Sequence, residues 1–223
     1  SNDGKNFTDV HNNGFLDELS ESEIANKGYF SDCHLVYDNT KDRLVLVYRL
    51  TDYDYELDYP REHVLLISKW TYDGKNWSDR EILANLDKND SIGWVVVSPA
   101  IIREKSMYNM WYVSSYNAPY SVSFSSSSDL KDWTKKKDCI LSGRKVEPWH
   151  IDCIKDSGKY LLVVYEFSNE LTLWESDDGL NFTFRKVLLP LAEGMRLVSA
   201  ASAAELPFQP ASTFYHSLGY VKH

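Results

Sequence analysis

The stretch Trp70-Thr71-Tyr72-Asp73-Gly74-Lys75-Asn76-Trp77-Ser78 decides the fold, because its pattern returns twice along the chain. The second copy is Ser128-Asp129-Leu130-Lys131-Asp132-Trp133-Thr134, and the third is Ser176-Asp177-Asp178-Gly179-Leu180-Asn181-Phe182-Thr183. The closing aromatic residues stand at positions 77, 133 and 182, which gives periods of 56 and 49 residues. Periods of this length, each holding several short strands and an aromatic-capped turn, are typical of the blades of a β-propeller.

The repeated turn has a physical rationale. Gly74 and Gly179 can adopt a positive φ in a tight hairpin, and the aromatic residue that follows can fold back onto the blade. Leu130 replaces the glycine in the second copy. We therefore expect that turn to differ slightly from the other two.

From position 30 onward, the pattern predicts short strands separated by turns, and no long window shows helical periodicity. We expect an all-β fold, a β-propeller with four-stranded antiparallel blades. Residues 30–223 are expected to form this single domain. The polar residues 1–29 would pack on it, with a short helical turn or an outer strand at 16–25. The clearest predicted strands are 44–48, 64–68, 95–97, 108–113, 121–124, 160–165 and 171–174.

The repeat decays after Pro190. Residues 196–204 and 213–221 could be strands of a fourth blade, but no third Asp-Gly turn follows. Three repeats and a remnant are few for a closed ring. Three alternatives therefore stay open: the blades are small, the N-terminal segment completes one of them, or part of a longer chain lies outside this sequence.

Composition argues against several classes of protein. The chain has 223 residues, enough for a sizeable core, and its 14% aromatic content favours sheets and stacking surfaces for sugars. The net charge of −9 argues against a nucleic-acid partner, and no apolar run is long enough to span a membrane.

No signal peptide is visible. Ser1-Asn2 resembles the remnant of a cleaved tag, so localisation is open and secretion or a cell-surface location stays an alternative.

Two aspartates are the candidates for chemistry. In a propeller the first strand of each blade lines the central axis, and Asp32, Ser98 and Asp152 are predicted to hold equivalent places in the three repeats. Strand alternation adds His34 to the face of Asp32, and His150 to the face of Asp152. Two carboxylates at one pocket are the minimal equipment for glycoside hydrolysis. The alternative is that each aspartate caps a strand or bonds a neighbouring backbone.

Other side chains could contact a ligand. Trp149 is either a stacking platform for a sugar ring or a packing residue between blades. Arg49 and Arg196 end or enter apolar strands, where each would pair with a carboxylate or clamp a substrate. His34 and His150 could hold a metal such as an axial calcium, but no metal-ligand spacing supports this. We therefore expect no cofactor.

The sequence resembles the five-bladed β-propeller glycosidases of glycoside hydrolase families 43 and 32, over about residues 30–200. Ser31-Asp32-Cys33-His34 is similar to the Asp-Pro opening of their first blade. His150-Ile151-Asp152-Cys153-Ile154-Lys155-Asp156-Ser157-Gly158-Lys159-Tyr160 is similar to a later blade with Ile-Asp-Pro and Asp-Gly-x-Tyr. The Trp-His-Ile-Asp form more closely resembles uncharacterised propeller relatives. The resemblance implies that Asp32 is the base or nucleophile, and that Asp152 orients the sugar and tunes the pKa of the acid.

The chain also departs from those enzymes. They carry a catalytic Glu that opens a later blade in Glu-Gly-Pro or Glu-Cys, whereas Gly194-Met195-Arg196 stands here. Glu147, Glu166 and Glu205 are the substitutes, with Glu166 taken as the candidate acid. The expected function is a glycan-binding, glycoside-hydrolysing propeller with a carbohydrate partner. The alternative is a non-catalytic carbohydrate-binding or scaffold propeller that lacks the acid.

Overall fold

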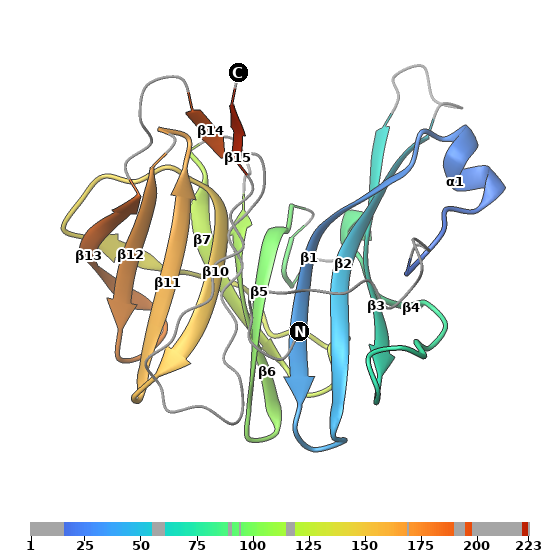
Figure 1. Ribbon diagram of the computed structural model, residues 1–223, viewed down its shortest axis with the longest axis horizontal. Coiled ribbons are helices and arrows are strands. Elements are labelled where there is room, and N and C mark those ends of the chain that lie inside the picture. The colour runs from blue at the N-terminus through green and yellow to red at the C-terminus, as the bar shows by residue number, and fades with distance from the viewer. Residues whose placement is uncertain are drawn as a thin grey trace. The chain divides into compact units, whose positions relative to one another are not determined.

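A computed structural model describes residues 16–54, 61–88, 91–93, 95–114, 119–168, 170–189, 195–197 and 220–222 (Figure 1). The chain divides into two compact units, Ser1–Asn89 and Asp90–His223. Nearly all regular structure in the described residues is β, and each of the three larger sheets contains four consecutive antiparallel strands, to which a fifth, parallel strand is added in one sheet. These sheets confirm the predicted strand architecture. Closure of the sheets into a ring, the number of blades and the predicted division at residue 29 stay predictions.

The first unit is built on one four-stranded antiparallel sheet in the order β1-β2-β3-β4. Alternating and β-branched apolar residues form its strands, and Tyr48, Leu50 and Ile67 pack together on one face. The short 3-10 turn η1 follows the last strand. The elements are β1 (Tyr29–Asp38), β2 (Arg43–Asp54), β3 (Arg61–Thr71), β4 (Glu81–Asn85) and η1 (Leu86–Lys88).

A short helix, α1 (Glu21–Ala25), precedes this sheet. Ser20 caps it, because its side-chain oxygen accepts from the Glu23 backbone N–H while the Glu23 carboxylate accepts from the Ser20 N–H. This reciprocal pair is a capping box, which satisfies two backbone donors at the start of the helix. The helical alternative for residues 16–25 is therefore confirmed over Glu21–Ala25, and residues 1–15 of the N-terminal segment lie outside the described residues.

The second unit holds two larger sheets and one small one. Strand β9 joins the outer edge of β13 in parallel, so that the sheet begun by β10 has five strands. β14 and β15 pair antiparallel, in the region where the sequence predicts a fourth blade. The remainder of the predicted strands 196–204 and 213–221 lies outside the described residues. The elements are β5 (Val97–Glu104), β6 (Met107–Ser114), β7 (Ser121–Ser127), β8 (Lys137–Asp138), β9 (Ile140–Ser142), β10 (Pro148–Asp156), β11 (Lys159–Glu166), β12 (Leu171–Ser176), β13 (Asn181–Leu189), β14 (Met195–Leu197) and β15 (Tyr220–Lys222).

The two larger sheets of this unit share one apolar core. Their first strands, β5 and β10, lie side by side, as the propeller interpretation expects of successive blades (Figure 1). The Ser98 hydroxyl joins them, since it donates to the Ile151 carbonyl oxygen and accepts from the Ile151 N–H, each at 3.1 Å. The fully or nearly buried members of the core are Ala100, Trp111, Val113, Val122, Ile151, Cys153, Leu162, Val164, Trp174 and Phe182.

The repeated turn is organised by its aspartate. In all three copies one carboxylate oxygen of Asp73, Asp129 or Asp178 accepts from the backbone N–H groups two and three residues later, at 2.8–2.9 Å. The next residue has φ of 73° at Gly74, 70° at Leu130 and 73° at Gly179. The expectation that the second turn differs is therefore wrong at this position. Leu130 adopts the left-handed conformation that glycine favours.

The predicted strands lie within observed strands, with one correction. Of the residues 95–97, only Val97 belongs to a strand, because β5 begins there. The remaining six predicted strands fall inside β2, β3, β6, β7, β11 and β12. Short, β-branched apolar runs bounded by turn residues are therefore a sufficient signal for the strands of this chain.

Candidate functional site

Asp32 lies in a β-bulge of the first sheet. Pairing of β1 with β2 passes from Ser31 opposite Arg49 to His34 opposite Val47, and φ at Asp32 is 51°. The Asp32 carboxylate accepts from Arg49 Nη1 at 2.7 Å and from the Ser31 hydroxyl at 3.0 Å. Bulges of this kind redirect a side chain out of the regular alternation. Arg49 therefore pairs with a carboxylate, which is one of its two predicted roles.

Ser98 occupies the same place in the second sheet. Pairing of β5 with β6 shifts between Val97 and Ala100, and φ at Ser98 is 53°. Its hydroxyl is engaged by the Ile151 backbone. Asp32 and Ser98 are thus equivalent in backbone conformation, as the sequence predicts.

Asp152 does not share that place. The corresponding irregularity of β10 falls between Pro148 and His150, and Asp152 stands in a regular pair opposite Val163. The predicted equivalence of Asp152 with the other two positions is therefore wrong. Its side chain is buried, with 3% of the residue exposed, and Oδ1 accepts from the backbone N–H of Cys153 at 2.8 Å.

The two aspartates belong to different compact units, Asp32 to the first and Asp152 to the second. Their convergence on one pocket stays a prediction. Among the histidines, His150 shares a face of β10 with Asp152, because both stand in regular pairs two residues apart. The His150 ring stacks on Tyr165 at an interplanar angle of 8°. The bulge at Asp32 interrupts the alternation that would place His34 on the same face.

Glu166, the candidate acid, is a buried carboxylate with several partners. It accepts from the Thr172 hydroxyl at 2.8 Å, and Arg144 Nη2 lies 3.4 Å from its second oxygen. Thr172 in turn accepts from the Trp174 indole N–H at 3.0 Å. These contacts tie Glu166 into the framework of the second unit.

The other predicted contacts have mixed outcomes. Trp149 is half exposed and touches the rings of Tyr120, Phe167 and His150. The backbone of Arg196 lies in β14, and its side chain is outside the described part of the chain. Among the alternative acids, Glu147 is exposed and Glu205 also lies outside it.

Among the described residues, no group of three or more His, Cys, Asp or Glu side chains is arranged to hold a metal ion. No helix in the same part of the chain has the length and apolar character needed to cross a membrane.

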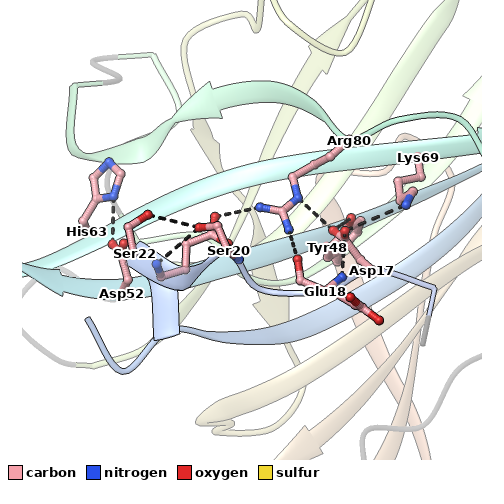
Figure 2. Close-up of polar contacts among 10 residues, drawn as sticks. Asp17, Glu18, Ser20, Ser22, Tyr48, Asp52, His63, Lys69 and Arg80 are labelled. Atoms are coloured by element: carbon pink, nitrogen blue, oxygen red, sulfur yellow. Dashed lines mark hydrogen bonds and ion pairs between the residues drawn. The ribbon is translucent and has the colours of Figure 1, made fainter. Parts of the chain in front are cut away.

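A polar network centred on Arg80 was not predicted (Figure 2). Arg80 donates to Asp17 at 2.8 Å, to Glu23 at 2.7 Å and to the Glu18 carbonyl oxygen at 2.7 Å. Tyr48 on β2 also donates to Asp17. Burial opposes the charge on Asp17, but the bonds from Arg80 and Tyr48 outweigh it and lower the pKa of Asp17. The network joins residues far apart in sequence, so no local pattern could reveal it.

The comparisons support a glycosidase-type fold. The chain is similar to an N-acetylgalactosamine deacetylase from F. plautii, solved with blood group B trisaccharide, at 16% identity and a TM-score of 0.65 over 84% of this chain and 61% of that one. It is similar to a family 117 glycoside hydrolase from the marine bacterium Zobellia galactanivorans, at 17% identity and a TM-score of 0.61 over 93% of this chain and 70% of that one. It is also similar to a GH32 β-fructofuranosidase from Bombyx mori, at 15% identity and a TM-score of 0.56 over 86% of this chain and 45% of that one.

These likenesses confirm, at the level of the fold, the resemblance to propeller glycosidases. The chain spans 61%, 57% and 59% of the length of three of the similar structures, the deacetylase and two Bacteroides glycosidases. No protein-family model matches the sequence. No curated protein matches it either.

Proposed function

We propose that this chain forms blades of a β-propeller that binds a glycan and hydrolyses a glycosidic bond. The observation that carries the proposal is the Asp32–Arg49 pair, held in a bulge of the first strand of a sheet whose fold is that of glycoside hydrolases. Two structures of similar fold hold carbohydrate, the deacetylase with its trisaccharide and a β-1,2-mannobiose phosphorylase from Listeria innocua with mannobiose. A carbohydrate is therefore the proposed partner.

Asp32 is the proposed base or nucleophile. A carboxylate in this role must be charged and correctly aimed. Arg49 gives the charged form a hydrogen-bond partner at 2.7 Å, and the bulge sets the direction of the side chain. Asp152 is the proposed modulator of the acid, and Glu166 the proposed acid itself. The proposed substrate contacts are His34, Arg49, Ser98, Trp149, His150 and Arg196.

A second candidate function is supported by the surroundings of Glu166. A general acid must deliver a proton to the leaving oxygen. The Glu166 carboxylate is engaged by Thr172 and by Arg144 instead. This favours a carbohydrate-binding propeller that does not hydrolyse its ligand.

One experiment separates the two functions. Aryl-glycosides and a panel of plant and bacterial polysaccharides would be incubated with the wild type, Asp32→Asn and the matched control Asp177→Asn, whose side chain is 86% exposed. We expect turnover by the wild type and the control, and loss of turnover in Asp32→Asn, with circular dichroism establishing that each variant is folded at the assay temperature. Equal turnover by the wild type and Asp32→Asn would refute hydrolysis through Asp32. Glycan binding without turnover by any variant would establish the binding function.

The thiol of Cys33 offers an independent probe, because it is exposed and follows Asp32 in the bulge. A glycan bound against Asp32 should slow its alkylation. Unchanged alkylation at saturating glycan would place the ligand elsewhere.

A further inference from the structure

Three aromatic side chains gather at one end of the sheet begun by β10. Tyr120 directly precedes β7, Trp149 is the second residue of β10, and Phe167 directly follows β11. The ring centroids of Trp149 and Phe167 are 4.8 Å apart, those of Tyr120 and Phe167 4.9 Å, and those of Tyr120 and Trp149 6.0 Å. These three residues are called the aromatic platform below.

Two rings of the aromatic platform are exposed, and the third, Tyr120, is partly buried against the apolar core. Trp149 is 37% exposed and Phe167 44%, although rings of this size usually lie inside a protein. Trp149 stands at the irregularity of β10, where the alternation of side chains is broken. The backbone N–H of Phe167 donates to the Glu147 carbonyl oxygen at 3.1 Å, which ties the two sides of the platform together. The rings are therefore fixed before a ligand arrives, which lowers the entropy cost of binding.

The chemistry of the platform suits a sugar ring. An aromatic face is electron-rich, so it attracts the weakly positive C–H groups on the apolar face of a pyranose. Three rings that touch at tilted and edge-on angles offer surfaces in different orientations, while exposed Glu147 supplies a carboxylate near Trp149 in sequence. Ligand sites of this kind combine aromatic walls with a few polar groups.

The charges near the platform favour a neutral ligand. Arg144, on the loop that leads into β10, is engaged by both Glu166 and Glu170. Its guanidinium is therefore already committed to two carboxylates. The chain as a whole has a net charge of −9, which repels uronate or sulfate groups.

We propose that Tyr120, Trp149 and Phe167 form a stacking subsite for a neutral pyranose ring. The proposal rests on the proposed function, because the ring would belong to the glycan bound by the same propeller. Beyond the proposed function, it names the residues that select the ligand and states that the sugar is uncharged. Trp149 supplies the largest face, and Phe167 and Tyr120 fix its orientation.

A screen of arrayed neutral and acidic glycans would first identify ligands. Calorimetric titration would then test the subsite with neutral oligosaccharides, each paired with its C6-carboxylate counterpart, such as β-1,4-mannotetraose and β-1,4-tetramannuronate. The variants are Trp149→Ala, Trp149→Phe and Phe167→Ala, with Tyr72→Ala as the control at a residue that is 67% exposed. We expect Trp149→Ala to weaken binding of the neutral sugar about tenfold or more. Trp149→Phe should retain most of the affinity, and Tyr72→Ala all of it.

The outcomes separate this inference from the proposed function. A wild type that binds no glycan overturns both. A wild type whose affinity survives in both Trp149→Ala and Phe167→Ala keeps the proposed function and overturns the platform. If the wild type binds the C6-carboxylate oligosaccharide more tightly than the neutral one, and Trp149→Ala loses this binding, the selection for a neutral ring is overturned. Circular dichroism of each variant establishes that it is folded.

Discussion

The indole N–H of Trp111 donates to the carbonyl oxygen of Gly179 at 2.7 Å, so a strand of one sheet is bonded to the repeated turn of the next. The approach is close enough that a Cβ at position 179 would lie 2.9 Å from Trp111 Cζ2. The glycine is therefore required for two reasons, its φ of 73° and the ring above it.

Gly179→Ala and Gly74→Ala should separate these two requirements. Gly74 has the same φ, but a Cβ there would meet nothing within 4 Å. We expect Gly74→Ala to cost about 1 kcal/mol of unfolding free energy from backbone strain, and Gly179→Ala about 1–3 kcal/mol more from the clash. Urea denaturation of both variants measures the difference. Equal losses would mean that Trp111 moves freely away.

Arg49→Met should destabilise the first unit strongly. The side chains of Arg49 and Asp32 are 11% and 7% exposed, so removing the guanidinium leaves a buried charge without this partner. Breaking a buried pair in this way costs about 3–5 kcal/mol. The double variant Arg49→Met/Asp32→Asn should recover part of the loss, because the charge is removed as well. Additive losses in a double-mutant cycle would contradict the coupling.

Acid should weaken the repeated turns. Backbone and side-chain hydrogen bonds from Asn181, with a further bond from the Leu180 N–H, lower the pKa of Asp178. A carboxylate with a lowered folded pKa stabilises the protein above its unfolded pKa of about 3.9, and this contribution is lost as the pH falls through the folded value. The stability difference between the wild type and Asp178→Ala should thus shrink below about pH 4. Denaturant titrations across that range, with Asp177→Asn as control, would detect it. A constant difference would contradict the prediction.

Arg80→Met should loosen the segment that carries α1. The variant loses the hydrogen bonds to Asp17, Glu23 and the Glu18 carbonyl oxygen (Figure 2). Loss of about 1.5 kcal/mol corresponds to roughly tenfold faster local opening. Hydrogen exchange of the amides in α1, compared with those of β2, is the measurement. Unchanged exchange would show that the remaining contacts, among them the bonds from Tyr48 to Asp17 and from Lys69 to the Leu16 carbonyl oxygen, are sufficient to hold the segment.

One of the three free cysteines should react quickly. Cys33 is exposed, whereas burial raises the pKa of Cys139 to about 12 and raises that of the fully buried Cys153 as well. The thiolate is the reactive form, so the part-buried Cys139 and the buried Cys153 should be inert near pH 8. A thiol-specific reagent should modify a single site, and Cys33→Ser should abolish that modification. Rapid labelling of Cys139 or Cys153 would contradict the prediction, and labelling of Cys153 would also contradict the burial of β10.

The strands and the repeated turn could be predicted because their signals are local. The pattern Asp-Gly-x-Asn fixes its own hydrogen bonds, and short apolar runs such as Tyr160–Tyr165 lie inside observed strands. The likeness of Asp32 and Ser98 was also predictable, since aligning the repeats on Tyr48 and Tyr112 brings the two residues together, and both stand at an irregularity of the first strand.

The remainder depends on register and on distant partners. The sequence pattern does not reveal where a strand pair becomes irregular, and in β10 this happens at Trp149, between Pro148 and His150, whereas Asp152 stands in a regular pair. The partners of Glu166 and Arg80 come from other elements, so only folding brings them together. The predicted difference of the second turn was wrong because Leu130 adopts a positive φ that a leucine disfavours, while its side chain is buried.

The parallel pairing of β9 with β13 means that the link between two sheets also covers part of the outer edge of the second, at Asn181, Phe182 and Thr183. An unpaired edge strand presents a row of free N–H and C=O groups with which a strand of another chain can pair. A proteolytic nick near Ile140 would therefore harm solubility before it harmed the remaining architecture. The linker therefore connects the two sheets and also limits pairing of this edge with strands of other chains.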